Sequence, residues 1–107
     1  MNKPHELIFV IVNAGHADAV MDAAKAAGAG GGTIIHGHGA ANKEAEAYFR
    51  IPVQSEKDAV MLVVPADIRD EVLHAVYRAA GMGTPAQGIA FSLPVTDAVG
   101  LREQETK

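Results

Sequence analysis

The chain has 107 residues, of which 49% are hydrophobic, and its formal net charge is −4. This length and apolar content predict one domain with a buried core over residues 1–107, and leave no room for a separate catalytic domain. The negative charge argues against a nucleic-acid partner, which would favour a basic face. The sequence has no cysteine, which excludes a disulfide framework and thiolate chemistry and fits a cytoplasmic protein.

Neither a membrane span nor a signal peptide is predicted. The longest apolar run, Leu7–Val12, is far too short to cross a bilayer. The segment Met1–Glu6 contains an acidic residue and precedes a strand-like run, which is not the pattern of a secretory signal. We therefore expect a soluble cytoplasmic protein.

The first half of the chain predicts a strand, a helix and a second strand. Leu7–Val12 is a continuous apolar run of the kind found in strands that are buried on both faces. The alanine-rich segment Ala17–Ala27 has small apolar residues on one face and predicts a helix, which the glycines within 28–32 end. Thr33–Ile35 begins a second strand, which runs into His36-Gly37-His38-Gly39.

The middle of the chain predicts a loop and two further extended segments. Ala40–Ala47 is polar and alanine-rich, and we interpret it as a loop. Tyr48–Val53 is expected to be extended, with Pro52 indicating an edge or a bulge. Gln54–Lys57 is expected to be a turn, and Asp58–Val64 to be the next buried strand.

A second helix follows, with Asp67 as its predicted N-cap and acidic residues in its first turn. Its apolar residues recur at helical spacing and predict a buried stripe. The stripe comprises Ile68, Val72, Ala75, Val76 and Ala79.

Gly81–Val95 connects this helix to the last strand, Ile89–Leu93. Gly81 and Gly83 are expected to take the left-handed backbone of a helix C-cap. A glycine-bearing loop of this kind leaves backbone N–H groups bare, which is one way to hold an anion. The alternative is a plain helix-to-strand connection, because isolated glycine loops are weak signals.

The two halves of the chain repeat one pattern. When Val12 is laid over Val64, the segment Leu7–Gly28 aligns with Ala59–Ala80 without a gap. Each half reads strand–helix–strand, so we predict an α+β, ferredoxin-like β-α-β-β-α-β sandwich. Both helices would cover one face of a four-stranded antiparallel sheet. The other face would be left bare, and we expect it to be covered by oligomerisation.

The sequence resembles the PII signal-transduction proteins from Leu7 to about Arg102. The most specific segment is Phe91–Val99, which resembles the family's Phe-x-x-Pro-Val-x-Asp-Ala-Val signature. The other segments that carry the resemblance are Leu7–Val12, Ala24–Gly28 and Gly32–Ile34. The resemblance implies a homotrimer with its sheets facing inward, which binds ATP or ADP in clefts between subunits. It also implies a long T-loop that docks onto transporters and enzymes.

The chain departs from the family at the loop between the second and third strands. Gly39–Ala47 is too short for the family's long loop, and Tyr48 is interpreted as a packing residue rather than a modifiable tyrosine. The family's glutamine, which helps to bind 2-oxoglutarate and magnesium, corresponds to Ala41, which has no ligand atom. The resemblance therefore does not extend to 2-oxoglutarate sensing.

The nucleotide loop is also altered. Two family glycines are kept at Gly83 and Gly88, whereas the middle glycine is replaced by Ala86. Three positions lack the cation that the family carries, and these are Ile89, Gly81 and Gly100. Losing charge-assisted hydrogen bonds weakens a polyphosphate site, so ADP or AMP is expected in preference to ATP.

No catalytic residue is expected. The ligand-binding residues that the resemblance implies are Thr33, His38, Gly39, Val64, Gly83, Thr84, Gln87, Gly88, Ile89 and Arg102. We expect a small non-enzymatic regulator of a transporter or metabolic enzyme, with nitrogen regulation as the family's role.

The histidines offer an alternative. His36 and His38 alternate by two, so on a strand they point to the same face and could share a metal ion. This would favour a metal-handling ferredoxin-like trimer of the divalent-cation-tolerance type. No third ligand is placed by spacing, and strand-end polar residues would show the same pattern, so no metal site is assigned. A trimer with only a structural role is the third alternative.

Overall fold

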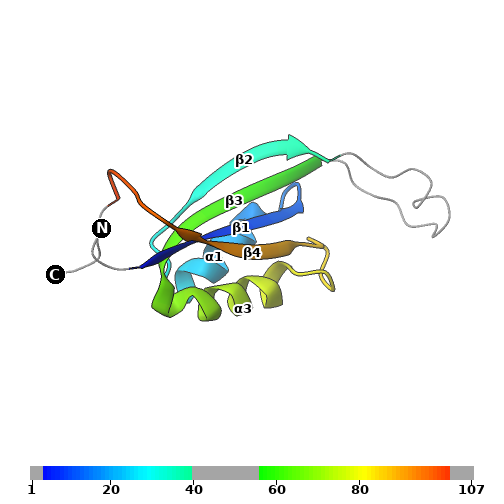
Figure 1. Ribbon diagram of the computed structural model, residues 1–107. Coiled ribbons are helices and arrows are strands. Elements are labelled where there is room, and N and C mark those ends of the chain that lie inside the picture. Colours follow the sequence, from blue (N-terminus) through cyan, green and yellow to red (C-terminus); the bar gives the residue numbers. More distant parts are fainter. Residues whose placement is uncertain (1–3, 40–55, 102–107) are drawn as a thin grey trace.

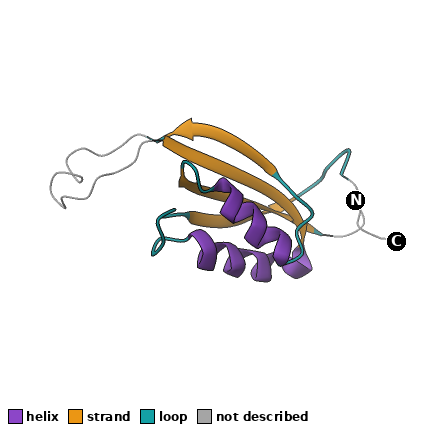
Figure 2. Cartoon of the chain, turned by 180° about the vertical axis from the view of Figure 1, so that it is seen from behind, coloured by secondary structure: helices purple, strands orange, loops and turns teal. Residues whose placement is uncertain are grey.

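The computed structural model of the protein describes residues 4–39 and 56–101. The chain order is β1 (His5–Asn13), α1 (Ala17–Ala26), β2 (Thr33–His38), β3 (Glu56–Pro65), the 3-10 turn η1 (Ala66–Ile68), α3 (Arg69–Ala80) and β4 (Ile89–Val95). The four strands form one antiparallel sheet in the order β2-β3-β1-β4, and both helices lie on the same face of it (Figures 1 and 2). The predicted β-α-β-β-α-β sandwich is confirmed.

The core lies between the helices and one face of the sheet. Alternate side chains of β1 and β3 point into it, because successive residues of a strand face opposite sides. The fully buried large side chains are Ile8, Val10, Val12, Val20, Val60, Leu62, Val64, Val72 and Val76. The alternate residues of β1 and β3 and the apolar faces of α1 and α3 thus form a single core.

The opposite face of the sheet is apolar and uncovered in one chain. No element within residues 4–39 and 56–101 covers the residues of β1 and β3 between the core positions, so their predicted burial on both faces would require the expected oligomer. Phe91 and Leu93 of β4 are 44% and 45% exposed on this face. Phe9 stacks on Phe91 with ring centroids 5.4 Å apart. An apolar face of this extent is what the sequence predicts for an oligomer interface.

The α1 helix ends as its sequence predicts. Gly28 has φ +113°, the left-handed conformation that favours glycine after a helix. Its N–H donates to the Lys25 carbonyl, and the N–H of Ala29 donates to the Ala24 carbonyl. This pair of bonds is a Schellman cap, and it buries Ala29 beneath the turn.

The start and the phase of α3 differ from prediction. Asp67 lies in η1, the residue before the helix is Ile68, and no side chain caps it. The core positions of the helix are Val72, Val76 and Ala80, whereas Ala79 is exposed. The 3-10 turn shifts the helix start to Arg69, and residues at i, i+4 and i+8 then face the core.

Gly81 does not have the left-handed backbone that was expected of it. Its φ is −76°, and the reason for glycine is space, since a Cβ there would lie 2.5 Å from the Tyr77 carbonyl oxygen. At Gly88 a Cβ would lie 2.4 Å from the Ala80 carbonyl oxygen and 2.7 Å from Val12. Both glycines allow close approach of backbone to backbone.

The predicted turn Gln54–Lys57 is wrong in its second half, because Glu56 and Lys57 already pair with β2. The predicted loop 40–47, the predicted strand Tyr48–Val53 and the expected frayed tail 103–107 lie outside the described residues.

A cluster of polar side chains joins the ends of β1, β2 and β3. The buried carboxylate of Asp58 lies 2.6 Å from Nδ1 of His36 and accepts the N–H of Gly15 at 3.1 Å. On the preceding residue, Lys57, the ammonium Nζ donates to Oδ1 of Asn13 at 2.7 Å. The His36 hydrogen bond, followed by that of the Gly15 N–H, lowers the pKa of Asp58 despite its burial.

We predict that Val72→Asp unfolds the protein. The substitution places an unpaired charge in the core at a cost of several kcal/mol, against a total stability of about 5–15 kcal/mol. As a control on the same helix, Ala79→Glu at an exposed position should cost less than about 1 kcal/mol. Thermal unfolding followed by circular dichroism checks both, and an unchanged melting temperature for Val72→Asp would contradict the core assignment.

We also predict an acid-dependent loss of stability from Asp58. Because its pKa is lower in the folded than in the unfolded chain, the ionised form stabilises the fold above the ordinary value of 3.8. That contribution is lost as the pH falls through the folded pKa. The melting temperature of Asp58→Asn should therefore lie below that of the original chain at pH 7, and the gap should close below about pH 4. Asp67→Asn, at an exposed position, is the control, and a gap that stays constant with pH would refute the role of the carboxylate.

Candidate functional site

Among the predicted ligand-binding residues, Val64 lies at one end of the sheet and a second group lies at the other. Val64 pairs with Glu6 near the start of β1, whereas Thr33, which begins β2, pairs with Met61 opposite Phe9 in the middle of β1. His38 and Gly39 lie at the other end, where Ile89 pairs with Ile11 near the end of β1. Arg102 lies outside the described residues. A single chain therefore does not bring these residues together.

The second group is itself divided between the two edges of the sheet. His38 ends β2, which is one edge, and Ile89 begins β4, which is the other. Three strand spacings separate the edges, which is about 14 Å. A ligand that contacts both would have to span the end of the sheet or lie between copies of the chain.

The loop between α3 and β4 is closed by its own hydrogen bonds. The N–H of Thr84 donates to the Gly81 carbonyl, that of Gln87 to the Thr84 carbonyl, and that of Gly88 to the Ala80 carbonyl. The Thr84 hydroxyl also donates to the Gly81 carbonyl at 2.7 Å. The expectation that the loop leaves its N–H groups bare for an anion is therefore wrong at these three residues.

Asn13 holds the loop against the sheet. Its backbone N–H donates to the Ala86 carbonyl at 2.9 Å, and its side-chain amide donates to the Pro85 carbonyl at 3.2 Å. Gln87 has φ +48°, an uncommon conformation for a residue other than glycine, and its side chain is exposed. Ile89 is 50% exposed beside it. The loop thus presents an amide and an aliphatic side chain on a fixed backbone.

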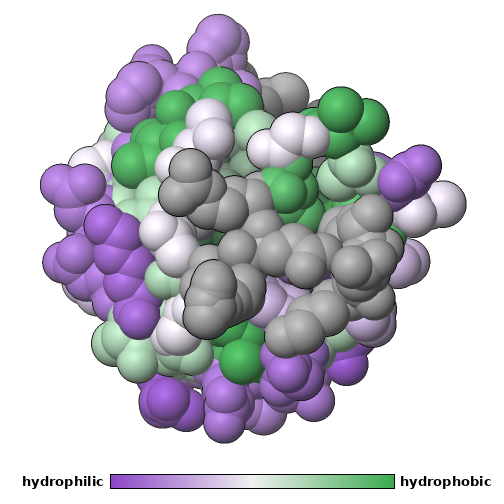
Figure 3. Space-filling view, turned by 90° about the vertical axis from the view of Figure 1, so that its left-hand side faces the viewer, coloured by the Kyte–Doolittle hydropathy of each residue, from purple (hydrophilic) through white to green (hydrophobic). Residues whose placement is uncertain are grey.

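At the opposite end of the sheet, the Val64 side chain is fully buried in the core. Only its main chain could face a ligand. A shallow hollow of about 250 Å³ lies nearby, lined by His5, Gly28, Gly30, Gly31, Val63, Pro65 and Leu101. Figure 3 views the molecule from this end and shows hydrophobic and hydrophilic residues side by side.

The predicted placement of His36 and His38 on one face of a strand agrees with the sheet. His36 is paired with Asp58 and His38 with Glu56 across β2 and β3. A hollow of about 450 Å³ adjoins His36, lined by Ala14, Gly15, Ala17, Asp18, Ile34, His36 and Asp58. Within residues 4–39 and 56–101, the structure contains no cluster of three or more histidine, cysteine, aspartate or glutamate side chains positioned to hold a metal ion.

Sequence reasoning missed the polar residues that organise this end of the sheet. Asp58 and Asn13 each lie at one end of an apolar strand run. A polar residue at the end of an apolar run could have indicated such a role. Its hydrogen-bond partners, however, lie on other strands and cannot be identified from the sequence. Lys57 was assigned to a turn, although its ammonium group bonds Asn13.

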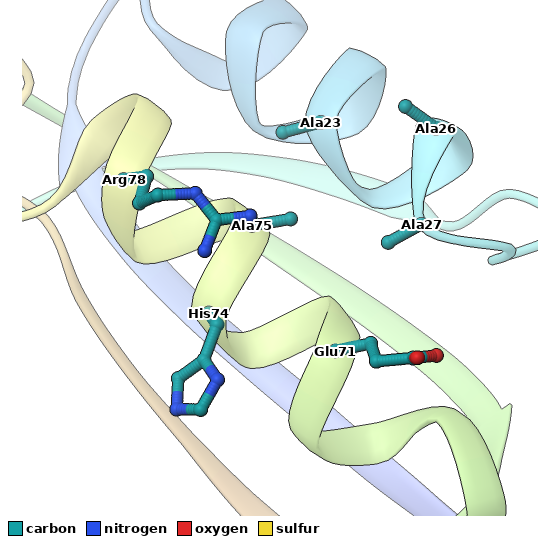
Figure 4. Close-up of a pocket in the computed structure, with 7 residues that line it drawn as sticks. All are labelled: Ala23, Ala26, Ala27, Glu71, His74, Ala75 and Arg78. Atoms are coloured by element: carbon teal, nitrogen blue, oxygen red, sulfur yellow. The ribbon is translucent and has the colours of Figure 1, made fainter.

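A further hollow, of about 470 Å³, lies between α1 and α3 and contains none of the predicted site residues. Its lining is Ala23, Ala26, Ala27, Glu71, His74, Ala75 and Arg78. Figure 4 shows the small side chains of α1 facing α3, which bears the charged residues. Small side chains let the helices lie close, so we interpret the hollow as a shallow groove on the helix face.

No helix in the described part of the chain is long and apolar enough to cross a membrane.

Comparison with solved structures finds the same fold. A candidate PII-like signaling protein from Thermus thermophilus matches with a TM-score of 0.65 at 15% identity, over 87% of each chain. PII from Arabidopsis thaliana, bound to citrate, matches with a TM-score of 0.70 at 22% identity, over 97% of this chain and 86% of that one. A Bacillus cereus protein related to NIF3 matches with a TM-score of 0.68 at 19% identity, over 89% of this chain and 26% of that one.

The comparison with curated proteins gives no match. The family model described as nitrogen regulatory protein P-II matches residues 5–105, which is nearly the whole chain. The match includes both halves of the repeat and both groups of predicted ligand-binding residues up to Arg102. The chain therefore belongs to the nitrogen regulatory protein P-II family.

Proposed function

We propose that the protein is a one-domain, non-enzymatic, cytoplasmic regulator that works as a homotrimer. In this proposal it binds a small ligand in clefts between subunits and controls a partner protein, such as a transporter or a metabolic enzyme. The observation that carries the proposal is that the family's ligand-binding positions in the described residues lie apart in one chain, along the length of the sheet and on both of its edges. Membership of a family of signalling proteins supports a regulatory role rather than catalysis.

The open sheet face supports assembly. Ile35, Val63, Phe91 and Leu93 are each between 39% and 48% exposed. They lie on strands whose opposite face is already filled by the helices. Burying a half-exposed large apolar side chain contributes on the order of 1 kcal/mol, and a closed trimer would repeat that gain in every copy.

A trimer also offers a way to complete the site. Copies that associate around their open faces can bring the Thr33 end of one chain to the Gly83–Ile89 end of the next. The loop is already fixed by Asn13, so its contribution requires no rearrangement. The ligand site would then exist only in the assembly.

The charges indicate which ligands are favoured. The described residues contain four lysines and arginines, which are Lys25, Lys57, Arg69 and Arg78. Lys57 is bonded to Asn13, and Arg69 lies 3.0 Å from Asp70. Arg78 lines the helix groove. No cation of the described part lies within the loop, so a ligand with less negative charge than ATP is favoured.

The first prediction from this proposal concerns assembly. Light scattering should give three times the mass of one chain at micromolar concentration. Phe91→Glu should shift the protein toward the monomer, because it places a charge on the open face and removes the stacking on Phe9. Tyr77→Glu changes a 58%-exposed aromatic residue on α3 and should leave the trimer intact. A monomeric original chain would overturn the proposal.

The second prediction concerns the ligand. Calorimetry at fixed ionic strength should show ADP or AMP binding more tightly than ATP. Ile89→Lys should strengthen ATP binding about 10- to 100-fold, because one charge-assisted contact contributes roughly 1.5–3 kcal/mol. Ala19→Lys adds the same charge on the exposed face of α1 and should have little effect. Tight ATP binding by the original chain would show that other cations supply the site.

A further inference from the structure

Four side chains with metal-binding groups share one face at the ends of β2 and β3. In the antiparallel register, His36 is opposite Asp58 and His38 is opposite Glu56. Opposite residues of such a pair have their Cβ atoms about 4.5–5.5 Å apart on the same face. Two imidazoles therefore lie along one strand, with two carboxylates along the next.

Asp58 fixes the orientation of the His36 ring. Its Oδ1 lies 2.6 Å from Nδ1 of His36, and its Oδ2 accepts the N–H of Gly15. An ionised carboxylate can only accept hydrogen bonds, so the hydrogen of a neutral His36 ring resides on Nδ1. The lone pair of Nε2 is then available, on a side chain that is 81% exposed. In metal sites, ligating histidines commonly donate their other ring N–H to a carboxylate in this way.

The surroundings favour a cation. Asp18 and Asp58 both line the hollow beside His36. Lys57, which lies between Glu56 and Asp58 in the sequence, alternates to the other face of β3, and its ammonium group is bonded to Asn13 at 2.7 Å. Its positive charge is thereby directed away from the histidines.

We propose that His36, through Nε2, and His38 bind a divalent transition-metal ion of the Zn²⁺ type, with the Glu56 carboxylate opposite as a third ligand. Imidazole suits Zn²⁺, Cu²⁺ and Ni²⁺, whereas Mg²⁺ and Ca²⁺ prefer oxygen ligands. Three protein ligands and a water molecule would give Zn²⁺ its usual tetrahedral coordination. His38 and Glu56 are exposed at the strand ends and turn toward the ion when it binds.

This site lies within one chain and uses no residue of the loop between α3 and β4. It does not depend on the proposed nucleotide cleft, although His38 is also among the positions predicted for that cleft. The test is therefore made without nucleotide.

The experiment is a calorimetric titration of the untagged protein with ZnCl₂. We expect one ion per chain, weaker binding in His36→Ala and in His38→Ala, and no binding heat in the double variant. His74→Ala removes an exposed histidine on α3 and is the matched control, which should bind as the original chain does. Absence of binding heat in the original chain, or undiminished heat in the double variant, would overturn the proposal.

The positioning role of Asp58 has its own test. Asp58→Asn should weaken Zn²⁺ binding by about 10- to 100-fold, as is usual when the partner of a ligating histidine is changed. Nitrogen NMR of the histidine rings in the original chain gives a second readout that does not depend on a variant's folding. We expect the His36 hydrogen on Nδ1 without metal and a Zn²⁺-dependent shift at Nε2 of His36. Shifts confined to His5, His16 and His74 would contradict the site.

Discussion

The alternation of β1 is the constraint on which the rest of the structure depends. The strand pairs with β3 on one side and β4 on the other, so it occupies the centre of the sheet. Ile8, Val10 and Val12 point to the helices, and the residues between them point to the open face. Because both sets are apolar, one strand both forms the core of the chain and requires a cover for the opposite face. In the proposed trimer, folding and assembly would thus be specified by the same short run of residues.

The end of β1 couples this sheet to the rest of the molecule. Asn13 receives a hydrogen bond from Lys57 and gives two to the loop between α3 and β4. Gly15, two residues later, donates to Asp58, which in turn contacts His36. The ends of β1, β2 and β3 and the loop therefore meet in one cluster of polar residues. Such groups are costly when partly satisfied and rigid when their partners are complete.

Much of the fold could be predicted from the sequence, because it rests on local patterns. The apolar runs, the helix stripes and the internal repeat each indicate an element without knowledge of its neighbours. The exact phase of α3 could not be predicted in this way. It depends on the 3-10 turn, where Ile68 packs over Gly28 of the other half of the chain. Ala80 therefore faces the core, although the local pattern indicated Ala79.

The candidate site was predicted less well, for the same physical reason. Gly81–Gly88 has the composition of an anion-binding loop, but three of its N–H groups, those of Thr84, Gln87 and Gly88, are bonded to carbonyls that only the folded loop brings close. The role of Asp58 was hidden because its partners come from β2 and from the turn after β1. The sequence shows which residue types are present, such as a glycine or a histidine. It does not show which distant residues they will contact in the folded chain.

The fixed loop changes how ligand selectivity should be understood in this chain. In a loop with bare N–H groups and several cations, affinity comes mainly from phosphate contacts, and it rises with the charge of the ligand. Here the N–H groups of Thr84, Gln87 and Gly88 are bonded to carbonyls of the same segment, and the exposed side chains of Gln87 and Ile89 carry no charge. In the proposed cleft, contacts with the uncharged part of a ligand would then supply most of the binding free energy. Those contacts would come from two chains, so ligand affinity and trimer stability would be linked, and each would strengthen the other.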